Sequence, residues 1–287
     1  DYGRIRLWGS LTFIAASFLG GLLIDRFGAG QGVWLVAFGC VLTVTAAHLL
    51  PRLPAQKHVQ AGDATQAPLW HVREPRLLLT SKAFIAFLIA AGGAQAAHAT
   101  MLTYGTLIWQ GQGLSAGFGG ALWAVAVLAE VALFAVSAPL LARYGAANFL
   151  IVGATVSVVR WLVMAFDPPL GLLLPLQVLH ALTYAGTHIG AIYFIAGAVP
   201  PSMQGSAQAL YATVASGVAM GLATLASGAL LTDFGSGLAY AAMAGIAMIA
   251  LGAALLLKRN WQGDLILSEV EALSSGGAAT PRPCPPA

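Results

Sequence analysis

Long apolar stretches separated by short polar turns recur along almost the whole chain. A helix needs roughly 20 apolar residues to cross the hydrocarbon core of a bilayer, and the sequence holds eight stretches near that length. Backbone groups inside lipid must be hydrogen-bonded within their own segment, so each stretch is predicted to be a helix. The predicted spans are Leu7–Ile24, Gly32–Leu50, Ala83–Trp109, Phe118–Leu141, Ala147–Phe166, Leu170–Val199, Ala207–Leu231 and Leu238–Leu257. The chain is therefore predicted to be an all-α polytopic membrane protein.

The composition agrees with lipid as the solvent of this chain. Hydrophobic residues make up 59% and charged residues 8% of the 287 residues, whereas soluble domains carry ~25% charged side chains. The sequence has no phosphate-binding glycine loop, no metalloprotease-type motif and no basic patch interleaved with aromatic residues. We therefore expect no nucleic acid partner, no metal and no other cofactor.

Lysine and arginine residues are distributed unevenly between the two sets of alternating loops. Arg26 stands alone on one side, whereas the other side carries Arg4, Arg6, Arg52, Lys57, Arg73, Arg76, Lys82, Arg143, Lys258 and Arg259. Cytoplasmic loops of membrane proteins are enriched in Lys and Arg. We therefore expect a multi-pass protein of the inner (plasma) membrane with both ends of this chain in the cytoplasm.

Ten residues at the end of the first span align without gaps with ten residues at the end of the seventh. The copies are Gly21–Gly30 and Gly228–Gly237, although small and apolar residues can also match by chance. Two six-span halves in parallel orientation are the arrangement of major facilitator transporters. The expected domains are the last two helices of a first half at 1–50, a cytoplasmic linker at 51–82, a complete second half at 83–258 and a cytoplasmic, disordered tail at 259–287. On this interpretation four further helices precede residue 1.

Two charged side chains lie well inside predicted spans. A charge at the bilayer centre costs at least ~2.5–3.5 kcal/mol on insertion scales, so both are candidates for function. Glu130 could take up a proton in one conformation and release it in another. Arg160, which Trp161 follows, could bind a carboxylate at two points. The alternatives are a structural Glu130–Arg160 ion pair and an arginine that extends toward the external interface.

Polar residues in the sixth span share one face of the predicted helix. His180, Thr183, Tyr184, Thr187 and His188 follow i, i+3, i+4, i+7, i+8 spacing. A polar stripe of this kind faces a bundle interior or a water-filled path and not lipid. Because histidine titrates near neutral pH, the stripe also offers proton sites.

The third span adds Gln95, His98 and Tyr104, and Tyr104 is a candidate for stacking on a ligand. Trp109, at the end of this span, is interpreted as an interface anchor. His98, His180 and His188 are scattered singly, and the two on one helix stand roughly 12 Å apart along its axis. No nucleophile–base pair stands out either, so we expect the protein not to be an enzyme.

Several short motifs together resemble the 3-phenylpropionate (hydrocinnamate) permease group of the major facilitator superfamily, which is related to oligosaccharide and nucleoside proton symporters. The motifs are Asp1–Ser10, Gln95–Ala99, Ile108–Gln110, Ala129–Val131, Val159–Trp161 and Gln177–His180, with His188 beyond. The resemblance implies a twelve-helix fold of which this chain supplies helices five to twelve. It also implies that Glu130, Arg160 and His180 shape a coupled proton and substrate site. One departure is that no acidic residue stands near His180 in its own span, where lactose permease has one.

The resulting hypothesis is a monomeric proton symporter that moves a small organic solute inward by alternating access. The resemblance favours an aromatic carboxylate such as 3-phenylpropionate. Proton coupling is assigned to Glu130, His180 and His188, and substrate binding to Arg160, His98, Tyr104, Tyr184 and Thr187. Its expected partners are the solute, protons and the lipid bilayer. Two alternatives remain open: a sugar or nucleoside symporter, in which Arg160 serves only Glu130, and a membrane scaffold or sensor without transport.

Overall fold

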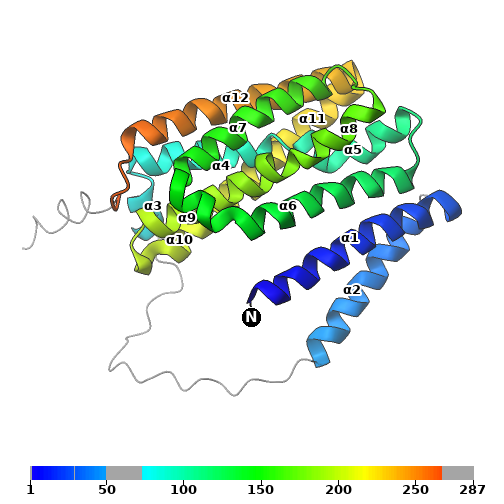
Figure 1. The fold of residues 1–287 in the computed structure, drawn as a ribbon, viewed down its shortest axis with the longest axis horizontal. Coiled ribbons are helices and arrows are strands. Elements are labelled where there is room, and N and C mark those ends of the chain that lie inside the picture. The colour runs from blue at the N-terminus through cyan, green and yellow to red at the C-terminus, as the bar shows by residue number, and fades with distance from the viewer. Residues whose placement is uncertain (1, 29, 50–72, 267–287) are drawn as a thin grey trace, which may run out of the picture. The chain divides into compact units, whose positions relative to one another are not determined.

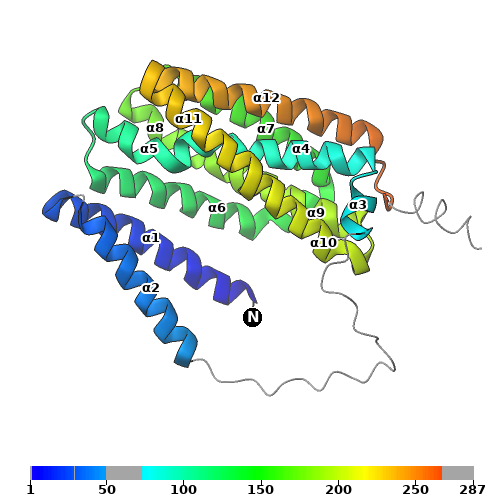
Figure 2. The same ribbon diagram turned by 180° about the vertical axis from the view of Figure 1, so that it is seen from behind.

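The computed structural model describes residues 2–28, 30–49 and 73–266, and every regular element within these ranges is helical (Figures 1 and 2). The α-helices are α1 Tyr2–Phe27, α2 Gln31–Leu49, α3 Arg73–Leu78, α4 Lys82–Ala96, α5 Ala99–Gly111, α6 Ala116–Tyr144, α7 Ala146–Met164, α8 Leu170–Val178, α9 Thr187–Ala198, α10 Gln204–Ala212, α11 Met220–Phe234 and α12 Ser236–Asn260. Two short π-helices, η1 Ala181–Gly186 and η3 Thr213–Ala219, and the 3₁₀ turn η2 Pro201–Met203 complete the set.

Seven helical segments of the described chain are long and apolar enough to cross a membrane. They are Gln31–Leu49, Lys82–Gly111, Ala116–Tyr144, Ala146–Met164, Leu170–Ala198, Gln204–Phe234 and Ser236–Asn260, which confirms seven of the predicted spans to within a few residues. The remaining predicted span, Leu7–Ile24, lies within the 26-residue helix α1. Most of the predicted linker at 51–82 and of the predicted tail at 259–287 lies outside the described residues.

The contacts divide the chain into two compact units. Among the described residues, unit 1 holds those within 1–71, 103–132 and 169–181, and unit 2 holds those within 72–102, 133–168 and 182–287. The division falls within α5, within α6 and at the start of η1. Each of these helices therefore contributes residues to both units.

In unit 1, α1 packs against the N-terminal part of α6 through glycine. A Cβ atom on Gly21 would lie 2.6 Å from the carbonyl oxygen of Ala116, and one on Gly120 would collide with the carbonyl oxygen of Ser17. The Asp25 carboxylate of α1 accepts hydrogen bonds from the first backbone amides of α6, those of Ala116 and Gly117. An anion stabilises a helix N-terminus because the amides there have no partner within the helix.

In unit 2, α12 packs along both α4 and α7, and α9 packs on the other side of α7 (Figure 1). Small side chains permit these close approaches, as in many membrane helix pairs: a Cβ atom on Gly93 of α4 would lie 3.1 Å from the Cβ of Ala250. Aromatic rings also pack between α4 and α9, where Phe87 stacks on Phe194 with ring centroids 4.4 Å apart.

Three of the spans are not single continuous α-helices, although the sequence analysis treated each as one. The third breaks at Ala97 and His98, the sixth contains η1, and the seventh contains η3. A short π-helix such as η1, called a π-turn below, still pairs its backbone groups through i→i+5 hydrogen bonds. It therefore leaves no unpaired backbone group in the apolar interior of the bilayer. Hydropathy alone cannot reveal it.

The two copies of the internal repeat end a helix in the same way. α1 ends at Phe27 and α11 at the corresponding Phe234. Each is followed by a glycine with positive φ, +90° at Gly28 and +85° at Gly235. Only glycine adopts this backbone region without strain, so the turn accounts for the matched glycine.

Candidate functional site

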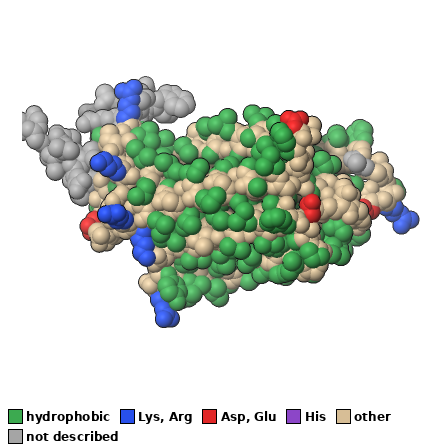
Figure 3. Space-filling view, turned by 90° about the horizontal axis from the view of Figure 1, so that it is seen from above, with side chains coloured by type: hydrophobic (Ala, Val, Ile, Leu, Met, Phe, Trp, Pro, Cys, Tyr) green, Lys and Arg blue, Asp and Glu red, His purple; other side chains and the backbone are tan. Residues whose placement is uncertain are grey.

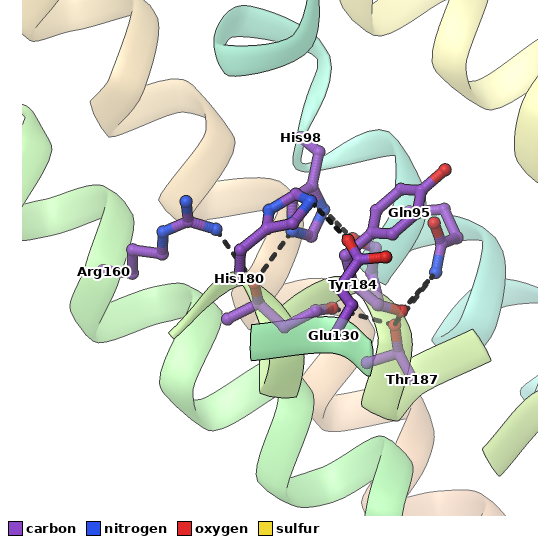
Figure 4. A network of polar contacts seen from close by, with 9 residues as sticks. Gln95, His98, Glu130, Arg160, His180, Tyr184 and Thr187 are labelled. Atoms are coloured by element: carbon purple, nitrogen blue, oxygen red, sulfur yellow. Dashed lines mark hydrogen bonds and ion pairs between the residues drawn. The ribbon is translucent and has the colours of Figure 1, made fainter. Parts of the chain in front are cut away.

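In unit 1, a carboxylate and an imidazole form a pair inside the apolar helices. The Oε1 atom of Glu130, in α6, lies 3.0 Å from the Nε2 atom of His180, the residue just before η1 (Figure 4). The side chains are 18% and 4% exposed, respectively. At this distance the two groups can share one proton, either as carboxylate and imidazolium or as a neutral hydrogen-bonded pair.

The Trp123 side chain packs against the imidazole of this pair in unit 1. The Trp123 ring meets His180 edge to face, with centroids 6.1 Å apart, and its Nε1 atom donates a hydrogen bond to the Thr106 hydroxyl. Trp109 lies next to Trp123 and is 1% exposed, so its interpretation as an interface anchor is wrong. Trp123 was missed by the sequence analysis because an aromatic residue in an apolar span carries no distinguishing signal.

In unit 2, Arg160 of α7 and His98 converge on one hydroxyl group. The Nη1 atom of Arg160 donates to the Oγ1 atom of Thr183 at 3.0 Å, and the Nε2 atom of His98 lies 3.0 Å from the same oxygen. His98 also contacts the carbonyl oxygen of Ala94 through Nδ1. A carbonyl cannot donate, so Nδ1 carries a proton. In a neutral imidazole, Nε2 then accepts the proton of the Thr183 hydroxyl.

Aromatic rings enclose this polar cluster of unit 2. The guanidinium carbon of Arg160 lies 4.5 Å from the ring centroid of Trp161, a cation–π contact. The Trp161 ring in turn stacks on Tyr240 and meets His98 edge to face. Arg160 is 1% exposed and Trp161 is fully buried, which does not fit the alternative of an arginine extended to the interface.

The π-turn η1 carries the remaining contacts of the cluster in unit 2. Gln95 of α4 donates from Nε2 to the Thr187 hydroxyl at 2.9 Å and to the backbone carbonyl of Tyr184 at 3.2 Å (Figure 4). The Thr187 hydroxyl donates to the carbonyls of Thr183 and Tyr184. Carbonyl groups in a π-turn therefore serve as acceptors for side chains of a neighbouring helix.

The residues of the predicted polar stripe have different partners. His180 pairs with Glu130 in unit 1, whereas Thr183 and Thr187 join the cluster of unit 2. His188 instead faces Tyr211, with Nδ1 3.4 Å from the phenol oxygen.

Tyr104, also predicted as a substrate-binding residue, belongs to unit 1 and is partly buried.

The predicted stripe of the sixth span assumed the residue spacing of a regular α-helix. The π-turn η1 changes the direction in which the residues beyond it point. The contact of Gln95 with the carbonyl of Tyr184 in η1 could not be predicted from sequence, because it depends on which helices pack together. Among the described residues, no group of three His, Cys, Asp or Glu side chains could hold a metal ion.

The sequence model of the MFS_1-like family matches residues 1–242. The chain belongs to this family of major facilitator proteins. Apolar helices and this membership together indicate a multi-pass membrane protein, and major facilitator proteins are transporters, not enzymes.

Individual relatives agree with this family. The chain is 32% identical over 260 residues to a probable 3-phenylpropionic acid transporter of Escherichia coli (strain K12), an alignment that covers 89% of this chain and 64% of the relative. It is 31% identical over 243 residues to a maltose permease of Geobacillus stearothermophilus, with coverage of 84% and 59%. The chain thus spans less than two thirds of the length of these relatives.

A solved structure supports the fold. The structure of a mutant of the nucleoside transporter NupG superposes with a TM-score of 0.71 and 20% sequence identity. The match covers 90% of this chain and 67% of that one. At this identity the likeness concerns the fold alone.

Proposed function

We propose that this chain is part of a proton-coupled carrier that moves a small organic solute across the inner membrane by alternating access. The proposed solute is an aromatic carboxylate such as 3-phenylpropionate. Residues 1–50 supply the last two helices of the first half and residues 83–258 the second half. The bias of Lys and Arg between loops supports cytoplasmic chain ends. The matched helix ends at Phe27 and Phe234, each followed by a glycine with positive φ, support the six-helix repeat.

The observation that carries the proposal is the Glu130–His180 pair within unit 1. A carboxylate and an imidazole 3.0 Å apart form a proton site in an otherwise apolar region. A conformational change that separates them alters the proton affinity of both, because each stabilises the charged form of the other. Coupling requires such a difference between the inward and outward states. His188, beside Tyr211, is a further site that can exchange protons.

The buried guanidinium of Arg160 supports an anionic solute. It can bind a carboxylate at two points, and the rings of Trp161 and Tyr240 offer an apolar wall for an aromatic group. In this proposal His98, Tyr184 and Thr187 line the same region of unit 2. Tyr104, in unit 1, is a separately proposed solute contact.

Moving a monoanion inward against a membrane potential costs ~2.3 kcal/mol per 100 mV. One accompanying proton cancels this charge, so the two parts of the proposal support each other.

A neutral, hydroxyl-rich solute is the second candidate. Gln95, Thr183 and Thr187 present amide and hydroxyl groups suited to sugars, and a maltose permease is among the relatives. In that case Arg160 does not bind the solute. Replacement of Arg160 by Ala should then leave the apparent affinity for the solute almost unchanged, whereas an aromatic carboxylate should bind at least about tenfold more weakly without its cation.

Replacement of Glu130 by Gln tests the coupling. In proteoliposomes that hold the complete carrier, E130Q should abolish accumulation driven by a pH gradient but preserve exchange of labelled for unlabelled solute, since exchange needs no net proton release. Asp233→Asn is the matched control, because Asp233 is exposed at the end of α11. Uphill, pH-driven uptake that survives in E130Q contradicts the proposed role of Glu130, and exchange that is lost as well points to a structural role.

A further inference from the structure

An apolar pocket of about 340 Å³ lies in unit 2 between the end of α6, the start of α7 and the π-turn η1. Its lining includes Leu133 and Tyr144 of α6, Val152 of α7, and Leu182 of η1. The volume falls within the range of small-molecule sites, ~300–1,000 Å³. Val152 is 48% and Tyr144 50% exposed, so the pocket opens on the outer face of these helices.

Glycine shapes the inner wall of this pocket. Gly153 of α7 and Gly186 of η1 both line it and present backbone in place of side chains. A Cβ atom on Gly153 would collide with the Thr187 side chain and lie 2.9 Å from the carbonyl oxygen of Leu182. Helix α7 can therefore lie directly against the π-turn only because Gly153 has no side chain.

A cation stands at one end of the pocket. The guanidinium carbon of Arg143 lies 5.3 Å from the ring centroid of Tyr144, and the Tyr144 ring lines the pocket. Leu133 marks the opposite end, ten residues earlier in α6, roughly 15 Å along the helix axis. The hydrocarbon core is roughly 30 Å thick. With the Arg143 end of α6 placed at the membrane surface, the pocket would extend to about the middle of the bilayer.

We propose that this pocket binds one acyl chain of an anionic phospholipid, whose phosphate pairs with Arg143. A soluble anion gains nothing from an apolar lining. A zwitterionic lipid gains less from Arg143 than an anionic one, because the positive group of its headgroup offsets the charge of its phosphate. A charged headgroup joined to an apolar tail satisfies both ends. Hydrophobic side chains cover the flank of the helices, and Lys and Arg side chains gather mainly at one end of the view (Figure 3), as for contact with lipid.

The bound acyl chain packs against the back of the turn that carries the polar cluster of unit 2. Leu182 and Gly186 line the pocket, and between them Thr183 contacts Arg160 and His98. This lipid site stands whether or not the chain transports an aromatic carboxylate. Only the leaflet from which the lipid comes depends on the proposed orientation.

Native mass spectrometry of the full chain in micelles with equal amounts of phosphatidylglycerol and phosphatidylcholine tests the proposal. One phosphatidylglycerol molecule should be retained, with about fivefold preference over phosphatidylcholine. This ratio corresponds to the ~1 kcal/mol that one basic residue contributes at the membrane surface. Val152→Trp, which fills the pocket, should remove this lipid. Val159→Trp is the matched control, because Val159 is 55% exposed on the same helix and does not line the pocket. An unchanged lipid count in V152W overturns the proposal.

The headgroup contact has its own pair of variants. Arg143→Gln should keep the bound lipid but reduce the preference to about one. Arg259→Gln, which removes an exposed cation at the end of α12, should leave the preference as it is. An anionic preference that persists in R143Q, or that falls equally in R259Q, contradicts the role of Arg143.

A measurement on the unaltered chain covers the case in which a variant fails to fold. Phosphatidylglycerol with a photoactivatable group on its acyl chain should cross-link mainly to peptides that contain residues 133–153 and 182–186. Cross-links spread evenly over all exposed apolar helices show ordinary lipid contact and overturn the pocket.

Discussion

At the scale of single residues, the Thr183 hydroxyl carries more contacts than its size suggests. It accepts a hydrogen bond from Arg160 and contacts His98, and all three side chains are at most 1% exposed. Burying a guanidinium is costly unless its hydrogen bonds are satisfied. Thr183 therefore positions the Arg160 guanidinium, and its hydroxyl connects this guanidinium with the His98 imidazole.

Thr183→Val tests this role, because valine keeps the shape of threonine and removes the hydroxyl. A hydrogen bond to a charged group contributes ~1.5–3 kcal/mol, and we expect the free energy of unfolding of the solubilised chain to fall by about this amount. Thr155→Val is the control, since the Thr155 hydroxyl bonds only within its own helix and is exposed; its effect should stay within ~0.5 kcal/mol. Equal effects of the two variants in thermal unfolding would refute the positioning role.

From the sequence, individual polar residues inside the spans could be identified, but the residues that they contact could not. Glu130, Arg160 and His180 could be found because a polar group inside an apolar span is costly and therefore conspicuous. Their contacts could not be found in the same way. The predicted first span ends at Ile24, before Asp25, but Asp25 lies within α1 and accepts hydrogen bonds from the first amides of α6. Such a pairing depends on the packing of segments far apart in sequence.

At the scale of helices, glycine decides which segments approach closely. Gly119 and Gly120 are neighbours in α6 with opposite surroundings: a Cβ atom on Gly119 would lie 3.5 Å from the Thr106 side chain, an ordinary contact, whereas one on Gly120 would collide with the backbone of Ser17 in α1. Span limits were predictable because hydropathy sets them. The π-turns were not, since one extra residue in a hydrogen-bond ladder leaves hydropathy unchanged.

These neighbouring glycines predict stability effects of opposite sign. Alanine is a better helix former than glycine by ~0.8–1 kcal/mol, so Gly119→Ala should be neutral or should stabilise the chain. Gly120→Ala forces α1 away from α6 and should destabilise unit 1 by ~1–3 kcal/mol. Thermal unfolding of the solubilised chain and protease cleavage within α1 report both effects. If G120A proves as stable as G119A, the close contact between α1 and α6 is wrong.

At the scale of the whole molecule, the charge bias, the repeat and the family membership support one another. The MFS_1-like match covers residues 1–242, and the six-helix repeat derived from Gly21–Gly30 and Gly228–Gly237 agrees with parallel halves. We propose that this chain supplies helices five to twelve of the carrier and that both of its ends lie in the cytoplasm. The orientation can be tested directly by labelling.

Single cysteines on opposite turns test the orientation. With Cys40 and Cys284 replaced by serine, Gln112→Cys introduces a thiol in the proposed external turn. Ala142→Cys introduces one beside Arg143, at the proposed cytoplasmic end of α6, and both positions are exposed. A membrane-impermeant maleimide added to intact spheroplasts should label Q112C and leave A142C unlabelled, because ten basic residues hold the side of Arg143 in the cytoplasm. Permeabilised cells provide the control, in which both thiols should react. Labelling of A142C but not of Q112C in intact spheroplasts would contradict the orientation, because it would place Arg26 in the cytoplasm and the ten other basic residues outside. The lipid proposed at Arg143 would then belong to the outer leaflet.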